Sequence, residues 1–326
     1  MRFERLWFAV KVLVWLLLFT YVVLHAFVLR RQTAESVFVV LLFPDQVFLL
    51  ILAFAVTFFN GKIQRLFIID WLPFMLFVIL YYFMRSLIIH AHGFVHIAEP
   101  YAWEKTLFGW ALGGRTPAEI FQEWKRLHAE DTLKYAADAA AALFYVLHFV
   151  VPFLFAFALW RRGRDRRMFY RFASALTLVN LLALITFVVY PTAPPWYRDF
   201  YGVLQPTHSH YAQAGAGLMA VDAVLKIRLF TTLWDAFNPN YFAAVPSLHG
   251  TWPLIVAVFA RVRFGRRANA VFLYPLAVCL AGAYLNHHYF VDYFVGWLYF
   301  WLAWRVTHAW LMPWLDTKTP YRLNSR

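Results

Sequence analysis

The sequence contains a single cysteine, Cys279, and few charged residues, which make up 14% of its 326 positions. One cysteine excludes a disulfide framework and any metal site built from several cysteines. The low share of charge, set against 63% hydrophobic residues, is not the composition of a soluble globular protein. The composition therefore indicates a protein of the lipid bilayer.

Acidic residues are scarcer than basic ones, with 17 Asp and Glu against 30 Lys and Arg, and the formal net charge is +13. In a soluble protein this excess would suggest a nucleic-acid partner. Here the basic residues fall in short clusters between apolar runs, so membrane orientation explains them better, and we expect no nucleic acid as a partner. Aromatic residues make up 21% of the chain, and abundant Trp and Tyr are typical of the two interfacial belts of a bilayer protein.

Long apolar runs predict an all-α, polytopic membrane protein with about eight transmembrane helices. The first run is longer than the apolar core of a signal peptide, so we expect it to be a retained helix. The chain has no recognisable repeat or soluble domain. The predicted spans are 6–29, 37–59, 66–89, 135–160, 168–190, 246–262, 268–285 and 289–311.

The distribution of basic residues predicts the orientation of these spans. If the N-terminus faces the cytoplasm, the inner segments, such as 161–167 and 261–267, are short and rich in arginine. The opposite side carries two long loops, 90–134 and 191–245, in which Lys and Arg are diluted. This bias places the loop 191–245 on the non-cytoplasmic side, together with His288.

The loop 90–134 contains a predicted helix of its own. Thr116 suits an N-cap, Pro117 the first helical position and Glu119 the third, as in a capping box. The residues that follow place apolar and charged side chains on opposite faces, which is typical of a helix lying in the membrane interface.

Two polar motifs interrupt the apolar C-terminal half. One of them contains His288 and Asp292 and lies at the start of the span 289–311. His288 and Asp292 lie four residues apart and therefore share one helix face. Ionisable groups are costly at membrane depth, and a carboxylate beside an imidazole orients the ring and makes it more basic. A pair that only anchors the helix end at the interface is the alternative.

The second motif, Ala-Val-Pro-Ser-Leu-His-Gly at 244–250, stands where the long loop enters the span 246–262. Pro246 suits the first helical position, and the free N–H groups of a helix start favour a phosphate. His249 falls in that first turn, and alone it also fits an ordinary interfacial histidine. Two histidines on one side of the membrane together indicate phosphoryl transfer through a phosphohistidine, which demands no metal.

These residues resemble the type 2 phosphatidic acid phosphatase superfamily, and more narrowly the inositol phosphorylceramide synthases. The superfamily resemblance rests on Pro-Ser-Leu-His and on the spacing from His288 through Asp292 to Gly296. The narrower resemblance rests on longer stretches, chiefly Tyr-Pro-Thr-Ala-Pro-Pro-Trp-Tyr at 190–197, Phe-Ala-Ala-Val-Pro-Ser-Leu-His at 242–249 and Tyr-Leu-Asn-His-His-Tyr-Phe-Val-Asp at 284–292. Matched by position, it implies that His288 is the nucleophile, Asp292 its orienting carboxylate and His249 the general acid and base.

The resemblance covers about residues 66–311 and implies a catalytic core of about six helices. Residues 1–65 would add two N-terminal helices, and 312–326 would form a cytoplasmic tail. The implied reaction moves phosphoinositol, or a similar head group, from phosphatidylinositol to ceramide and releases diacylglycerol. The expected partners are these two lipids and the bilayer, without a cofactor. The active site would face the periplasm or a lumen, and the compact loops favour a cell membrane, or a Golgi membrane in a eukaryote.

One departure from the superfamily bears on the reaction. Its hydrolytic phosphatases carry an arginine six residues before the nucleophile, where this sequence has Gly282. The departure favours transfer over hydrolysis, and the phosphate must then find other donors. Interfacial anchoring or core packing is the alternative for each of the residues that we assign to substrate binding. These are Ser247, Arg198, His148, His287 and Arg85.

Two other functions stay open at this point. A lipid phosphate phosphatase would use the same histidines and aspartate, and a non-enzymatic lipid transporter or scramblase would use buried histidines to relay protons. A zinc site at His92 and His96 would require a third ligand, and histidines of an interfacial loop are far commoner than such sites. We therefore expect no metal.

Overall fold

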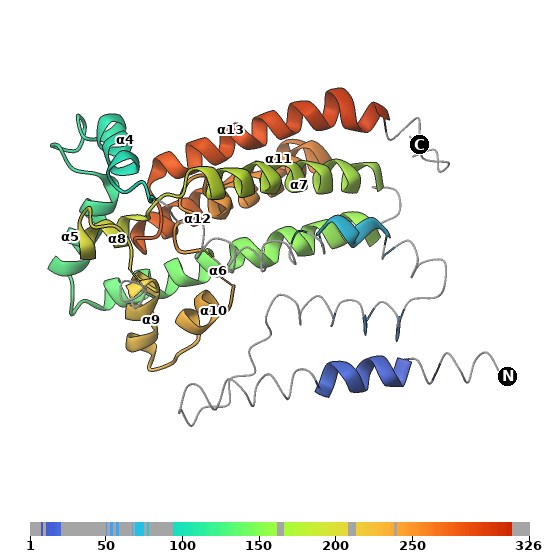
Figure 1. The fold of residues 1–326 in the computed structure, drawn as a ribbon, viewed down its shortest axis with the longest axis horizontal. Helices are drawn as coiled ribbons and strands as arrows, with labels where there is room; N and C mark the ends of the chain where they lie inside the picture. The colour runs from blue at the N-terminus through green and yellow to red at the C-terminus, as the bar shows by residue number, and fades with distance from the viewer. Residues whose placement is uncertain are drawn as a thin grey trace. The chain divides into compact units, whose positions relative to one another are not determined.

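Figure 1 shows the fold in a computed structural model. The structure describes residues 8, 11–20 and 50, single positions or short stretches between 53 and 77, and then 94–161, 166–207, 213–237 and 240–314. Within these residues the elements are helices, with two isolated parallel bridges and no β-sheet. The predicted all-α class is confirmed for this part of the chain.

The chain groups into two compact units, Met1–Ser86 with Thr232–Pro239 and Leu87–Thr231 with Asn240–Arg326. In the first unit, Trp15 Nε1 donates a hydrogen bond to Thr57 Oγ1 at 2.7 Å. Most of the three predicted N-terminal spans lies outside the described residues. The count of about eight spans and the division into three parts stay predictions.

Two long apolar helices run through the second unit, α6 (Thr132–Arg161) and α7 (Arg166–Val189). By length and composition both could cross a membrane. They correspond to the predicted spans 135–160 and 168–190. Figure 1 shows α6 and α7 running in the same general direction as the C-terminal helices.

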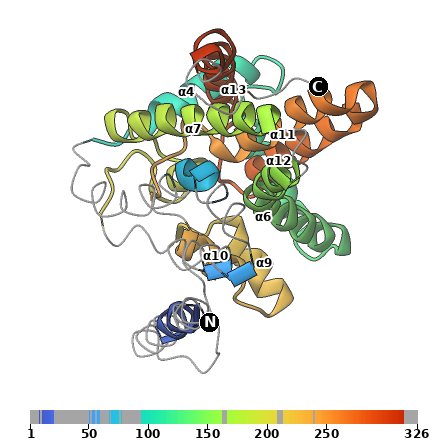
Figure 2. The ribbon, with the colours of Figure 1, turned by 90° about the vertical axis from the view of Figure 1, so that its right-hand side faces the viewer.

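The C-terminal helices are α11 (Leu248–Phe264), α12 (Leu273–Tyr284) and α13 (Phe290–Val306). A 3₁₀ segment, η2 (Gly265–Phe272), precedes α12, and a short π-helical turn, η3 (Thr307–Leu311), follows α13. The central member is α11, which packs against α6, α7, α12 and α13 (Figure 2).

The start of α11 differs from the prediction. Ser247, not Pro246, precedes the first helical residue, and its extended backbone and side chain make it the N-cap. Its hydroxyl accepts a hydrogen bond from Gly250 N at 3.5 Å, which satisfies one of the free N–H groups of the first turn. The prediction that Pro246 occupies the first helical position is therefore wrong, and His249 is the second residue of the helix.

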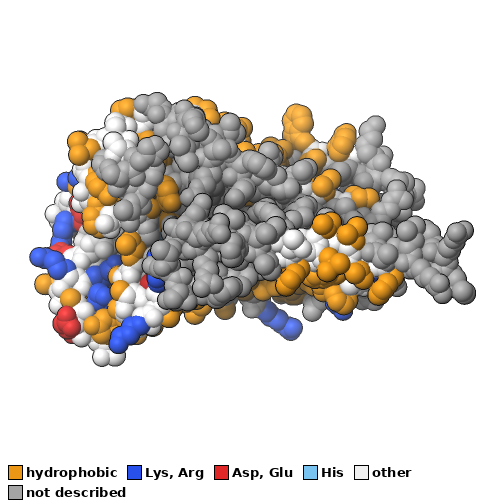
Figure 3. Space-filling view, turned by 60° about the horizontal axis from the view of Figure 1, so that its bottom comes forward, with side chains coloured by type: hydrophobic (Ala, Val, Ile, Leu, Met, Phe, Trp, Pro, Cys, Tyr) orange, Lys and Arg blue, Asp and Glu red, His pale blue; other side chains and the backbone are white. Residues whose placement is uncertain are grey.

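Shorter helices lie in the two long loops: α4 (Ala98–Phe108), α5 (Pro117–Leu127), α8 (Pro195–Tyr201), α9 (Gly217–Leu225) and α10 (Phe230–Phe237). In Figure 1, α4, α5 and α8 gather at one end of the long helices. In Figure 3, most of the blue and red side chains gather at that same end. The capping box of α5 is confirmed, because Thr116 Oγ1 accepts from Glu119 N and Glu119 Oε2 accepts from Thr116 N.

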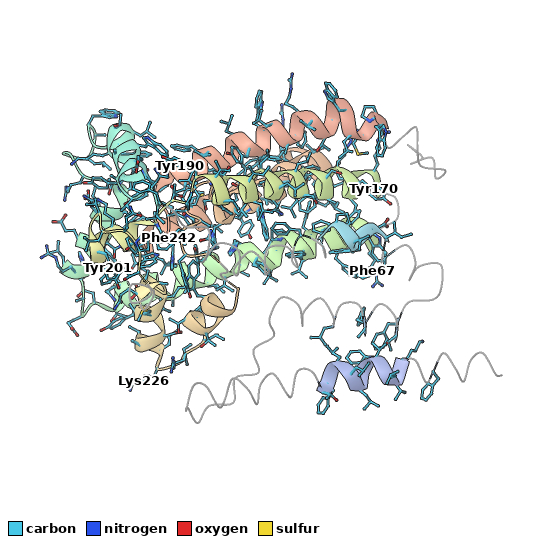
Figure 4. All side chains as sticks on the ribbon, viewed as in Figure 1. Phe67, Tyr170, Tyr190, Tyr201, Lys226 and Phe242 are labelled. Atoms are coloured by element: carbon cyan, nitrogen blue, oxygen red, sulfur yellow. The ribbon has the colours of Figure 1, made fainter. Side chains whose placement is uncertain are left out.

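Backbone hydrogen bonds join the loops into one layer at this end. Thr192 N donates to Phe242 O at 2.9 Å, and Thr192 Oγ1 accepts from Val245 N at 2.8 Å. Trp196 N donates to Asn286 O at 3.0 Å, which fixes α8 to the segment before His288. Tyr190 and Phe242, labelled in Figure 4, lie in this layer. Both ends of the loop 191–245 are thus tied by hydrogen bonds to the segments that carry the two polar motifs.

Candidate active site

The site begins with the N-terminal turn of α13. Asp292 is the third residue of this helix and is completely buried. Its Oδ2 accepts hydrogen bonds from Tyr289 N at 2.9 Å and from His288 Nδ1 at 3.2 Å. The carboxylate therefore caps the helix and orients the imidazole at once. It leaves the Nε2 atom of His288 as the nitrogen with a lone pair.

The first turn of α11 brings the second histidine to that lone pair. His249 Nδ1 lies 3.0 Å from His288 Nε2, and the two ring centroids are 4.9 Å apart. A backbone hydrogen bond from Ser247 N to Asp292 O, at 2.9 Å, ties the two helix starts together. The result is a continuous chain of hydrogen bonds from Asp292 through His288 to His249.

Gly296 explains how the two helices come this close. A Cβ atom here would collide with Thr251 Oγ1 and would lie 2.8 Å from Ser247 O, both on the α11 side. Any larger residue would push α13 away from α11. The glycine one turn after Asp292 is therefore a packing requirement of the site.

An aromatic ring fixes the planes of two histidines. Tyr145 of α6 is buried and stacks on His249, with centroids 4.4 Å apart and ring planes at 6°. The same ring stacks on His287, with centroids 5.1 Å apart and ring planes at 14°. These two stacks set the planes of both imidazoles, and no sequence motif had pointed to Tyr145.

His148 also belongs to this cluster. It lies one turn after Tyr145 on α6, its Nδ1 is hydrogen-bonded to Tyr145 O, and its ring centroid is 4.1 Å from that of His249. The structure thus brings together His148, His249, His287 and His288, all named from the sequence. Ser247 lies beside them, with its hydroxyl used in capping α11.

Glu104 of α4 is a second residue that sequence reasoning missed. Its fully buried carboxylate accepts hydrogen bonds from Phe290 N and Val291 N, each at 3.0 Å. Burial raises the pKa of Glu104 to about 7, although the two N–H groups oppose that shift. Glu104 thus fixes the first turn of α13 to α4, a helix of the loop 90–134. No local pattern predicts this contact, because 186 residues separate the partners.

Of the two arginines predicted to bind substrate, the structure describes Arg198. Arg198 of α8 lies over the Tyr101 ring, 3.4 Å from its centroid, and 3.9 Å from Glu119 Oε1, so it already has an aromatic and an acidic neighbour. Arg85 lies outside the described residues. Lys125 of α5, which was not among the predicted binding residues, donates to Tyr284 O at 3.3 Å, and burial lowers its pKa. Its ammonium group lies at the end of α12, close to the segment that carries the histidines.

Among the described residues, no group of three His, Cys, Asp or Glu side chains could hold a metal ion. His92 is not described, and His96 Nδ1 is hydrogen-bonded to Glu99 Oε1 at 2.9 Å while its ring stacks on Tyr190.

Two hydrogen-bonded imidazoles, backed by a buried carboxylate at the start of a helix, can take up and release a phosphoryl group without a metal. This fold and site define a class of helical proteins in which the starts of two helices bring a pair of histidines together beside a buried carboxylate. The PAP2 superfamily model matches residues 115–306, which include the whole histidine cluster. The chain belongs to the PAP2 superfamily and, within it, to the family of the inositol phosphorylceramide synthases.

Three curated relatives support the narrower family. Phosphoinositol dihydroceramide synthase of Bacteroides thetaiotaomicron is 32% identical over 76% of this chain and 81% of its own length. The catalytic subunit aur1 of inositol phosphorylceramide synthase of Schizosaccharomyces pombe is 32% identical over 45% of this chain and 34% of its own. The corresponding subunit of Saccharomyces cerevisiae is 31% identical over 43% and 34%. No solved structure matches the chain with comparable significance.

Proposed function

We propose that this protein transfers phosphoinositol from phosphatidylinositol to the primary hydroxyl of a ceramide, and that the transfer passes through a phosphohistidine on His288. The observation that carries the proposal is the hydrogen-bonded chain from Asp292 through His288 to His249. The names of the relatives, which specify phosphoinositol with dihydroceramide or inositol phosphorylceramide, support the choice of lipids.

In the first step, the Nε2 lone pair of His288 attacks the phosphorus atom of phosphatidylinositol. The bond from phosphorus to the diacylglycerol oxygen breaks, and His249 gives that oxygen a proton. A distance of 3.0 Å between the two ring nitrogens leaves no room for a phosphoryl group between them. Substrate binding must therefore replace this hydrogen bond and widen the gap between the two rings.

In the second step, the ceramide hydroxyl gives its proton to His249 and attacks the same phosphorus atom. The bond from phosphorus to His288 breaks, which releases the phosphoinositol ceramide and restores both rings. Asp292 supports each step in the same way, because its negative charge stabilises the cationic imidazole that carries the phosphoryl group.

We further propose that the protein spans the membrane several times, with the site on the non-cytoplasmic face. The arginines in the last turns of α6 and α11, Arg161, Arg261 and Arg263, support this orientation, because His249 lies at the opposite end of α11. The layer of loop helices α8 and α9 would then cover the site from the aqueous side.

The test uses purified protein in detergent micelles with inositol-labelled phosphatidylinositol and a fluorescent ceramide. Formation of labelled phosphoinositol ceramide together with diacylglycerol supports the proposal. Free inositol phosphate without any ceramide product would instead identify a hydrolase. Full lipid turnover by both His288→Ala and Asp292→Asn would contradict catalysis at this site.

A further inference from the structure

Tyr293 follows Asp292 in α13 and is completely buried. Its ring centroid lies 5.5 Å from that of His288, so it forms one wall beside the proposed nucleophile. The two-step mechanism assigns it no part.

Two glycines on neighbouring helices create the space for this ring. A Cβ atom on Gly282 of α12 would collide with the Tyr293 hydroxyl. A Cβ atom on Gly250 of α11 would collide with Cδ1 of the same ring and would lie 3.0 Å from Cε1. The phenol therefore fills the volume that side chains at both positions would otherwise take. Gly282 and Gly250 are compatible with their surroundings because they lack a side chain.

Packing, rather than a hydrogen bond, holds the ring in this slot. The Tyr293 hydroxyl has no hydrogen-bond partner within the part of the chain that the structure describes. A buried hydroxyl without a partner is unfavourable, so the benefit of the residue lies in the volume of its ring. A phenylalanine would fill nearly the same volume.

The position of this ring matters because of the intermediate. A phosphohistidine on His288 reacts with any hydroxyl that reaches it, and water is the commonest one. On the protein side of His288, the space is taken by Asp292 and by the Tyr293 ring, with Tyr145 next to the same slot. Removing the ring would open a cavity beside the histidine.

We propose that Tyr293, seated between Gly250 and Gly282, is a specificity-determining residue that keeps water from the His288 intermediate and so sets the ratio of transfer to hydrolysis. With the ring in place, a ceramide hydroxyl breaks the phosphorus–nitrogen bond and gives its proton to His249. Without it, water attacks in the same way and the product is inositol phosphate. The inference rests on the proposed function.

The experiment measures this ratio directly, as labelled inositol phosphate against labelled phosphoinositol ceramide from purified enzyme. For Tyr293→Ala we expect the share of hydrolysis to rise about tenfold, which corresponds to about 1.4 kcal/mol between the two barriers. For Tyr293→Phe we expect the wild-type ratio. Tyr274→Ala is the matched control, since Tyr274 of α12 donates to Leu147 O and is not among the nearest neighbours of either glycine of the slot. Its ratio should stay at the wild-type value.

A second pair of variants tests the slot without emptying it. Gly282→Ala displaces the ring through the collision with the hydroxyl and should raise hydrolysis. Adding Tyr293→Phe removes the colliding oxygen and leaves the new Cβ atom 3.4 Å from Tyr145 Cε2 and 3.5 Å from Tyr293 Cζ. The double variant should therefore regain the wild-type ratio. This rescue keeps the test decisive if Tyr293→Ala fails to fold.

A folded Tyr293→Ala enzyme with an unchanged ratio would overturn the inference, as would a Gly282→Ala enzyme with an unchanged ratio. A Tyr293→Phe enzyme that hydrolyses as much as Tyr293→Ala would also overturn it, because the hydroxyl would then act in the chemistry. The proposed function fails separately, in the wild type, if no phosphoinositol ceramide forms. A wild type that only hydrolyses would contradict both.

Discussion

Replacing Asp292 with Asn tests the role of the carboxylate with little change of shape. An asparagine oxygen in the place of Oδ2 could still accept from Tyr289 N and His288 Nδ1, so the fold of the turn should survive. The charge is lost. If the amide turns instead, its NH₂ group faces Nδ1 and forces the proton onto Nε2, which blocks the nucleophile.

The size of the effect follows from the geometry. The Oδ2 atom lies 3.2 Å from Nδ1, so the charges on the carboxylate and on a cationic imidazole are about 4 Å apart. At an effective dielectric constant of about 20 their attraction is about 4 kcal/mol, which corresponds to about a thousandfold in rate. The equivalent substitution in the Ser-His-Asp triad costs about ten thousandfold in kcat. We expect kcat to fall into this range and KM to change little.

The assay is steady-state transfer of labelled phosphoinositol to ceramide in micelles, with a thermal unfolding scan of each variant. Asp138→Asn is the control, because this buried carboxylate bonds to Tyr284 and Lys134 rather than to a histidine. The control should lose stability and keep kcat within about threefold, well inside the range of indirect effects. A folded Asp292→Asn enzyme that also stays within about threefold would refute the reasoning.

Three further predictions concern the supports of the site. Burial raises the pKa of Glu104 from 4.5 to about 7. Between pH 4.5 and about 7 the folded protein therefore holds a proton that the unfolded chain has released, and the free energy of unfolding should fall by about 3 kcal/mol as the pH rises through this range. Unfolding scans across this pH range should show a smaller fall for Glu104→Gln, and an identical pH dependence would contradict the assignment. Gly296→Ala places a Cβ atom against Thr251 Oγ1 and should cost about 1–3 kcal/mol and lower kcat, whereas an unchanged Tm and rate would remove the packing argument. Thr116→Ala removes the side-chain cap of α5, so the free energy of unfolding should fall by about 1 kcal/mol, measured as a lower Tm, while kcat stays at the wild-type value.

Local patterns predicted the parts of the fold that depend on local physics. The spacing of His288 and Asp292 required only the period of a helix, and the capping box of α5 required only side-chain chemistry within one turn. Apolar runs located α6 and α7 within a few residues. The start of α12 was predicted less accurately, because a 3₁₀ segment, η2, precedes the α-helix, and α11 begins after Ser247 rather than at Pro246.

Contacts between distant segments explain what the sequence could not reveal. Glu104 acts on α13 and Tyr145 on His249, and neither contact leaves a periodic signal. The sequence showed Gly282 in the place of an arginine. The reason why a glycine fits there, the Tyr293 ring of α13 packed against α12, depends on a contact between two helices. Arg198 was chosen for its place after Pro-Pro-Trp-Tyr, and its neighbours Tyr101 and Glu119 come from the other loop.

Trapping the intermediate tests the proposed phosphohistidine most directly. Purified enzyme is mixed with inositol-labelled phosphatidylinositol in the absence of ceramide, quenched in alkali, in which phosphohistidines persist, digested and analysed by mass spectrometry. We expect a phosphoinositol group on His288, absent from His288→Ala and lost when ceramide is added before quenching. Label on His249, or transfer at the full rate with no labelled histidine at any time, would contradict it.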